Sequence, residues 1–132
     1  MRSADILADA FGRVQDTVHG AVRGLTSSQL AVRLDRDANS IAWLIWHLTR
    51  VQDDHLAGAF AVPQVWTEYG KRFELPFPPA DIGYGHSSEQ VAQVTVASGD
   101  LLTGYHDAVH EQTLRLIAGV TGADLDRVVD EA

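Results

Sequence analysis

Histidine is the residue type best suited to chemistry in this chain of 132 residues, which has six histidines and no cysteine. The lack of cysteine excludes a disulfide, a thiolate ligand and a cysteine nucleophile, so any metal site must use His, Asp or Glu. The serines that stand out lie at expected helix starts, where capping explains them: Ser27, Ser28, Ser87 and Ser88.

His47 lies in a long apolar stretch that we expect to be helical. At about 100° per residue, Leu44 and Val51 fall within about 60° of His47. Arg50 and Asp53 turn to the other side. We therefore predict that His47 points inward, toward the core of the protein.

A buried structural histidine is the simpler alternative for His47. Asp54 lies close to the same direction two turns on, so a backbone carbonyl or Asp54 could satisfy the ring. His55 stays on the edge of the apolar stripe. His19 and His86 have no spacing argument and are expected at the surface.

His106 and His110 have the i, i+4 spacing that puts two imidazoles on one side of a helix. His106 lies nearer the apolar face, and His110 is displaced toward the polar surface. If the two histidine-bearing helices run parallel, alignment of their expected starts sets His106 level with about residue 58 and makes His55 its nearest partner. Exposed or hydrogen-bonded histidines are the alternative to a metal site.

Three long helices must position these side chains. Apolar residues at steps of three and four predict helices near 4–24 and 40–61, and a third from about 88 to 118 with an interruption near Ser98. Asn39 is the expected N-cap of the second helix. Capping boxes, each a side chain that bonds the backbone three residues on, are expected at Thr26/Gln29 and Ser87/Gln90.

A long crossover separates the second and third helices. Its proline and glycine content forbids a long regular element: Pro63, Gly70, Pro76, Pro78, Pro79, Gly83 and Gly85. Its aromatic residues argue that it packs over the bundle: Trp66, Tyr69, Phe73, Phe77 and Tyr84. Trp43 and Trp46 are expected in the core or an interface.

A faint repeat suggests that a fourth helix is missing. The motif GLTxxQL at residues 24–30 precedes the second helix and is echoed by GVTxxDL at 119–125, after which the chain stops. A chance match of common helix-end residues is the alternative. Three apolar stripes without a fourth helix would leave a groove, so we expect a homodimer that covers it.

Composition favours one domain over residues 1–132, in a cytoplasmic protein. The formal net charge of −8, without a Lys/Arg cluster, disfavours nucleic acid and anionic membranes as partners. No apolar run is long enough to span a bilayer, and Asp5 and Asp9 interrupt any signal peptide.

The segment from Asn39 to His55, NSIAWLIWHLTRVQDDH, resembles the second helix of the DinB/YfiT-like superfamily of metalloenzymes. Residues 64–66 and 83–89 resemble an uncharacterised actinobacterial branch, related to the metal-binding domain of mycothiol-dependent maleylpyruvate isomerase. The resemblance spans nearly the whole chain. It implies an all-α, DinB-like bundle of the up-down-down-up type, with a long connection between helices two and three.

The resemblance also implies a divalent metal such as Zn, Ni or Mn, with His47 as one ligand and two ligands from the fourth helix. Because this chain lacks that helix, three outcomes stay open. Another subunit completes the site, His55 and His106 are recruited locally, or the protein is metal-free.

Two functions follow from these expectations. The first is a metal-dependent transferase or isomerase that uses a low-molecular-weight thiol such as mycothiol or bacillithiol, with a small electrophile as the other partner. The bound ion would lower the pKa of the thiol, so the protein itself would need no cysteine. The second is a non-catalytic domain for stress response or protein interaction, in which His47 is structural.

Overall fold

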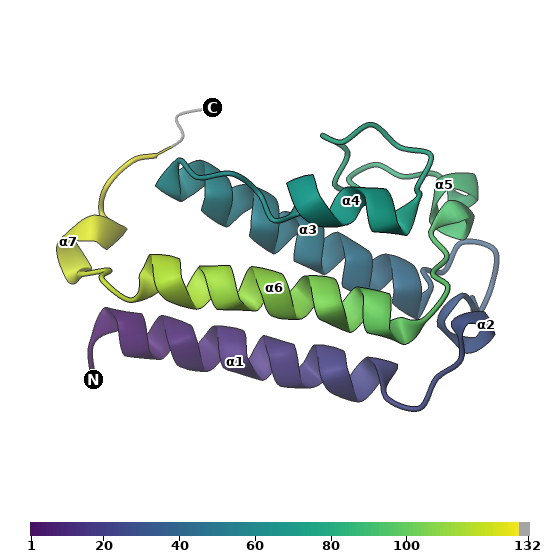
Figure 1. The fold of residues 1–132 in the computed structure, drawn as a ribbon, viewed down its shortest axis with the longest axis horizontal. Helices are drawn as coiled ribbons and strands as arrows, with labels where there is room; N and C mark the ends of the chain where they lie inside the picture. Colours follow the sequence, from purple (N-terminus) through teal and green to yellow (C-terminus); the bar gives the residue numbers. More distant parts are fainter. Residues whose placement is uncertain (130–132) are drawn as a thin grey trace.

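The computed structural model describes residues 1–129 as a bundle of three long helices, in agreement with the predicted all-α fold (Figure 1). The long helices are α1 (Ser3–Val22), α3 (Ile41–Phe60) and α6 (Gly99–Ile117). Four short helices join or follow them: α2 (Ser27–Leu30), α4 (Trp66–Phe73), α5 (Ser88–Gln93) and α7 (Gly122–Leu125). Within the described range, no helix is long and apolar enough to cross a membrane.

Helix α1 runs antiparallel to α6. The end of α1 meets the start of α6, where a Cβ atom added to Gly99 would lie 2.6 Å from Cγ1 of Val22. Further along α6, Asp107 accepts a hydrogen bond from Gln15, which lies earlier on α1. The two helices therefore run in opposite directions along most of their length.

Helices α3 and α6 run parallel. Thr49 contacts His106 and, farther along both helices, Gln52 donates a hydrogen bond to Thr113. Parallel neighbours require a long connection, which the chain provides between residues 61 and 98. The first three helices of the predicted up-down-down-up order are therefore in place.

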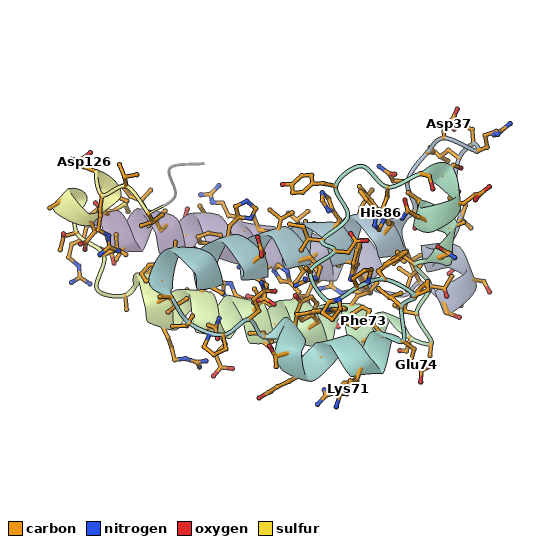
Figure 2. The ribbon with its side chains drawn as sticks, turned by 90° about the horizontal axis from the view of Figure 1, so that it is seen from above. Asp37, Lys71, Phe73, Glu74, His86 and Asp126 are labelled. Atoms are coloured by element: carbon orange, nitrogen blue, oxygen red, sulfur yellow. The ribbon has the colours of Figure 1, made fainter. Side chains whose placement is uncertain are left out.

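The core lies between the three long helices and beneath the crossover. Trp43 and Trp46 are both buried, as expected from the sequence. The largest apolar side chains with almost no exposure are Val18, Leu30, Trp46, Val94, Leu102, Tyr105 and Val109. Figure 2 shows the long axis of the bundle, with Asp37 near one end, Asp126 near the other and His86 nearer the Asp37 end.

Helix starts follow the predicted capping chemistry in two places and differ in one. Thr26/Gln29 and Ser87/Gln90 both form reciprocal capping boxes. Ser40, not Asn39, caps α3, because its hydroxyl accepts a hydrogen bond from the Trp43 amide. The N-cap prediction was therefore wrong by one residue.

The repeat noted in the sequence has a structural counterpart. Thr121 and Asp124 form a capping box that opens the four-residue helix α7, as Thr26 and Gln29 do for α2. The second copy differs in burial: Leu30 is fully buried, whereas Leu125 is 59% exposed.

The helix predicted from about 88 to 118 with an interruption near Ser98 is two helices, α5 and α6, and α6 begins where the interruption was expected. Val94 ends α5 in an extended conformation, and Ser98 caps α6 through its hydroxyl. The close approach of Gly99 to Val22 leaves no room for a side chain at this point. Since α6 begins at Gly99, His106 is level with Thr49 rather than with residue 58.

Candidate functional site

His47 is held against the crossover by one short hydrogen bond. Its Nδ1 lies 2.6 Å from the carbonyl oxygen of Ile82. A carbonyl oxygen can only accept, so Nδ1 must carry the proton. In the neutral ring the lone pair is then at Nε2, for which residues 1–129 provide no hydrogen-bond partner. His47 is half-buried, and Nε2 is not fully enclosed by the protein.

Aromatic side chains fix the plane of the His47 ring. Trp43 stacks on it, with ring centroids 4.6 Å apart and planes at 20°. Tyr84 meets it edge-on at 5.0 Å. Gly83 lies so close that an added Cβ would be 2.6 Å from Nδ1 of His47. The ring therefore has one accessible nitrogen and little rotational freedom.

The side of α3 that faces the core differs from the prediction. His47 is only half-buried and Leu44 is 44% exposed, whereas Arg50 and Asp53 are 0% and 1% exposed. The prediction that Arg50 and Asp53 turn away was wrong, and His47 faces the crossover rather than the bundle interior. The reason is that the start and middle of the crossover cover the flank of α3 that carries both charges.

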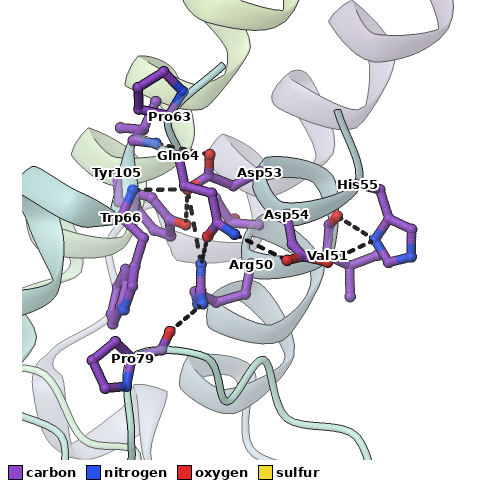
Figure 3. A network of polar contacts seen from close by, with 12 residues as sticks. Arg50, Val51, Asp53, Asp54, His55, Pro63, Gln64, Trp66, Pro79 and Tyr105 are labelled. Carbon is purple, nitrogen blue, oxygen red and sulfur yellow. Dashed lines mark hydrogen bonds and ion pairs between the residues drawn. The ribbon is translucent and has the colours of Figure 1, made fainter. Parts of the chain in front are cut away.

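Asp53 organises the start of α4 (Figure 3). Its carboxylate accepts hydrogen bonds from the backbone amides of Val65 and Trp66, at 2.9 and 2.8 Å. The N-cap of α4, Val65, has no side chain able to do this itself. Asp53 also accepts a 2.7 Å hydrogen bond from the Tyr105 hydroxyl. Burial, and then the Asp53 carboxylate, raise the pKa of Tyr105 well above its usual value.

Arg50 ties the crossover down at two points (Figure 3). Its guanidinium donates to the Gln64 side chain at 2.7 Å and to the Pro79 carbonyl at 2.8 Å. It also stacks over the Trp66 ring at 4.7 Å and lies 3.9 Å from the Asp53 carboxylate. The buried pair of Arg50 and Asp53 therefore chiefly fixes the crossover on α3.

The side chain of His86 is buried, contrary to the prediction that it lies at the surface. Its side chain is 3% exposed and its Nε2 lies 2.9 Å from both carboxylate oxygens of Asp81. Burial alone would raise the pKa of Asp81, but the hydrogen bonds from His86 and from the Gly83 amide outweigh it and lower the pKa. The other ring nitrogen accepts a 3.1 Å hydrogen bond from Trp43 Nε1.

His55 is exposed on α3. Its side chain is 60% exposed, and Nδ1 donates to the carbonyl of Val51 on its own helix, as Figure 3 shows. It lies beside Asp54, 3.7 Å away. The structure therefore does not make His55 the partner of His106.

His106 is fully buried between α3 and α6. The Thr49 hydroxyl donates to the Ile45 carbonyl, so it must accept its 3.0 Å hydrogen bond from Nδ1 of His106. Nε2 of His106 is buried without a partner among the described residues, as is Nδ1 of His110. Burial, and then the nearby His110, lower the pKa of His106 to about 4. His106 is therefore a neutral core residue at neutral pH.

His110 also departs from the sequence expectation, whereas His19 lies at the surface as expected. His110 is 9% exposed and belongs to the buried face of α6 rather than to the polar surface. His19 is partly exposed and lies 2.6 Å from the Asp107 carboxylate. Burial would raise the pKa of Asp107, but hydrogen bonds from His19 and Gln15 outweigh it and lower the pKa.

The three predicted ligands lie in three different environments. His47 faces the crossover, His55 faces solvent and His106 lies in the core. Within residues 1–129, no group of three His, Asp or Glu side chains lies close enough to hold a metal ion. The described residues thus provide one well-oriented imidazole rather than a complete metal centre.

A groove lies between α4 and the part of the crossover that follows it, residues 74–81. It has a volume of about 670 Å³ and mostly apolar walls that include Trp66, Gly70 and Phe77. Gln64 and Asp81 also line it, so it borders both the Arg50 network and the Asp81–His86 pair.

The fold and this histidine define a helical-bundle protein with an oriented imidazole on the helix before the crossover. The sequence profile of the DinB superfamily matches residues 10–132, so the chain belongs to the DinB superfamily. The crystal structure of a conserved protein from Enterococcus faecalis is similar, with a TM-score of 0.90 and 21% identity. The match covers 99% of this chain and 78% of that one. Comparison with the curated proteins gives no match.

Sequence reasoning selected His47 as a candidate but missed the residues that orient it. Asp81 and His86 lie within the crossover, and no helical periodicity connects them to α3. One signal was present: Gly83, Gly85 and His86 lie together in a segment otherwise rich in proline and aromatic residues. Glycine next to polar residues in such a segment is typical of a close backbone approach.

Proposed function

We propose that the chain binds a divalent metal ion, with Nε2 of His47 as one ligand. The supporting observation is the hydrogen bond from His47 Nδ1 to the Ile82 carbonyl. A metal-binding histidine nearly always donates its other ring N–H to a carbonyl, a carboxylate or water, which fixes its tautomer and orientation. Zn²⁺ and Ni²⁺ suit an imidazole ligand, and Mn²⁺ suits a site that adds carboxylates.

The residues of this chain fit one ligand position of such an ion. Since residues 1–129 hold no group of three suitable side chains, the remaining ligands would come from outside this range. A second copy of the chain is one source. His55, exposed on the same helix, is available to such a shared site, whereas His106 is sealed within the bundle.

Metal content tests this proposal. We expect stoichiometric metal in the protein after incubation with Zn²⁺, Ni²⁺ or Mn²⁺ and desalting, and a loss of most of it in His47→Ala. His19→Ala is the matched control, because His19 is also a partly exposed helical histidine but faces α6. Equal metal content in wild type and His47→Ala, or no metal in wild type with any of the three ions, would overturn the proposal.

The proposed reaction class is transfer or isomerisation that depends on a low-molecular-weight thiol, with mycothiol and bacillithiol as the candidates. A bound divalent ion lowers the pKa of a thiol and holds the thiolate as a nucleophile. The chain has no cysteine of its own, so such a nucleophile must be supplied. Calorimetric titration of the metal-loaded protein with each thiol should show binding that chelation removes. Absence of binding with both thiols would rule this class out.

A second candidate function, a protein-interaction domain, rests on a separate apolar groove. This groove has a volume of about 540 Å³ and lies between α1, the ends of α3 and α6, and the segment after α6. Its apolar lining includes Leu7, Phe11, Leu56, Phe60, Leu116 and Leu125. We propose that a second copy of the chain covers it, which would make the protein a homodimer.

Light scattering at micromolar concentration tests the homodimer. We expect a dimer for wild type and a folded monomer for Phe11→Glu, since Phe11 lines the groove. Thr17→Glu, at an exposed position on the same helix, should remain a dimer. A wild-type protein that is folded and monomeric contradicts the proposal. A dimer without bound metal would favour the interaction domain over the enzyme.

A further inference from the structure

The loop that carries Ile82 is held by a pair of side chains. Asp81 accepts a 2.9 Å hydrogen bond from the backbone amide of Gly83, which folds the loop around Ile82. Asp81 in turn pairs with Nε2 of His86, at 2.9 Å to each oxygen. Hydrogen bonds within the segment from Asp81 to His86 therefore hold the Ile82 carbonyl in place against His47.

This loop is connected back to α3 through Trp43. The Trp43 indole N–H donates to Nδ1 of His86 at 3.1 Å, and the Trp43 ring stacks on His47 at 4.6 Å. These contacts form a closed network. It runs from His47 through Trp43, His86 and Asp81 to the loop and back to His47. The side chains of His86 and Trp43 are nearly removed from water, which strengthens each hydrogen bond in this network.

This network of contacts determines which ring nitrogen of His47 and of His86 carries the proton. Trp43 Nε1 can only donate, so Nδ1 of His86 must be unprotonated and Nε2 must carry the proton that goes to Asp81. The Ile82 carbonyl can only accept, so His47 must carry its proton at Nδ1. The two histidines are therefore held as opposite tautomers.

We propose that Asp81 and His86 are positioning residues for His47: with Trp43 they hold the Ile82 carbonyl on Nδ1 and so present Nε2 as the ligand atom. The proposal rests on the proposed metal-binding function for the use of Nε2, but the tautomers themselves do not depend on a metal. Gly83 has the φ of +108° and the absence of a Cβ that this close contact requires.

Nitrogen-15 NMR of the metal-free wild-type protein tests the tautomers directly. At a pH where both rings are neutral, two-bond proton–nitrogen correlations distinguish a protonated from an unprotonated ring nitrogen. We expect His47 to be protonated at Nδ1 and His86 at Nε2, with signals assigned by their loss in His47→Ala and His86→Phe. The Nε2–H form at His47, or the Nδ1–H form at His86, in the wild-type protein would overturn the proposal.

Two variants test the link between the pair and His47. Asp81→Ala and His86→Phe remove the hydrogen-bonded pair that holds the loop. The His47 ring should therefore shift from the Nδ1–H form toward the Nε2–H form that predominates in free histidine. Glu89→Gln is the control: Glu89 is exposed and lies three residues after His86, outside this network of contacts, so the Nδ1–H form should persist. An unchanged His47 tautomer in both folded variants contradicts the positioning role.

Metal titration of the same variants separates this proposal from the function on which it rests. If His47 is a ligand, Asp81→Ala and His86→Phe should bind Zn²⁺ about 10- to 100-fold more weakly than wild type, with Glu89→Gln unchanged. A tautomer shift without Zn²⁺ binding in wild type supports the positioning role and rejects the metal site. Zn²⁺ binding that depends on His47 but not on Asp81 or His86 supports the metal site and rejects the positioning role.

Discussion

The Asp53 carboxylate on α3 accepts a hydrogen bond from the Tyr105 hydroxyl on α6, 2.7 Å away and out of contact with water. The same carboxylate caps α4. One side chain therefore joins the two parallel helices to the first turn of the crossover, and much of what can be tested about the fold concerns this junction.

Loss of the Asp53 carboxylate should destabilise the protein strongly. Asp53→Ala leaves the Arg50 guanidinium buried without its counter-charge and leaves two amides at the start of α4 without an acceptor. We expect a loss of about 3 kcal/mol or more in the free energy of unfolding, measured by urea denaturation. Asp54→Ala, next in sequence and partly exposed, should cost less than about 1 kcal/mol. Similar losses in the two variants would contradict this role.

Removal of the Tyr105 hydroxyl should have a smaller effect that depends on pH. Tyr105→Phe takes one donor from Asp53, so we expect a loss of about 1–2 kcal/mol at neutral pH. Because the folded protein raises the pKa of Tyr105, the unfolded chain ionises first as pH rises, and this tyrosine lowers stability above its usual pKa of 10.0. The difference in stability between wild type and Tyr105→Phe should therefore shrink in alkaline solution. A constant difference would argue against the raised pKa.

Burial of neutral His106 should make the fold sensitive to mild acid. The folded pKa of about 4 lies below the ordinary value of 6.5, so the unfolded state binds the proton first. Stability should fall as pH drops from about 6.5 toward about 4, by up to about 3 kcal/mol from this group alone. His106→Leu removes the proton-binding group, so its urea midpoint should change less over this range than that of wild type. Parallel curves for the two proteins would show that His106 does not titrate in this way.

Two neighbouring glycines separate backbone strain from contact with His47. Gly83 and Gly85 both have positive φ, +108° and +74°, but only Gly83 has neighbours within 4 Å of an added Cβ. Gly85→Ala should cost about 1 kcal/mol in the free energy of unfolding. Gly83→Ala should cost more and should displace the His47 ring, visible as shifted His47 signals by NMR. Equal costs and an undisturbed ring would show that the loop does not press on His47.

Much of the fold follows from local sequence patterns. Apolar residues spaced three and four positions apart located the long helices, and the capping boxes at Thr26 and Ser87 located two helix starts. Both signals depend on residues within one or two helical turns. The interruption predicted near Ser98 marks the start of α6, but the predicted alignment with α3 counted from the expected start near residue 88 instead of from Gly99. That single boundary moved the predicted partner of His106 from His55 to Thr49.

The candidate site was less accessible to sequence reasoning. The angular argument for His47 considered α3 alone and placed Arg50 and Asp53 outside, as charged residues usually are. Their burial depends on a crossover whose path no periodicity describes, with acceptors at Gln64 and Pro79.

The parallel arrangement of α3 and α6 has a consequence for how the chain folds. An up-and-down bundle can zip neighbouring helices together through short turns, whereas here the chain from residue 61 to residue 98 must close before α6 can dock beside α3. Loop closure of this kind costs entropy before any contact is gained, and it raises the mean sequence separation of contacts. The late event in folding is therefore expected to be the docking of α6, with the Arg50–Asp53 junction among the last contacts to form.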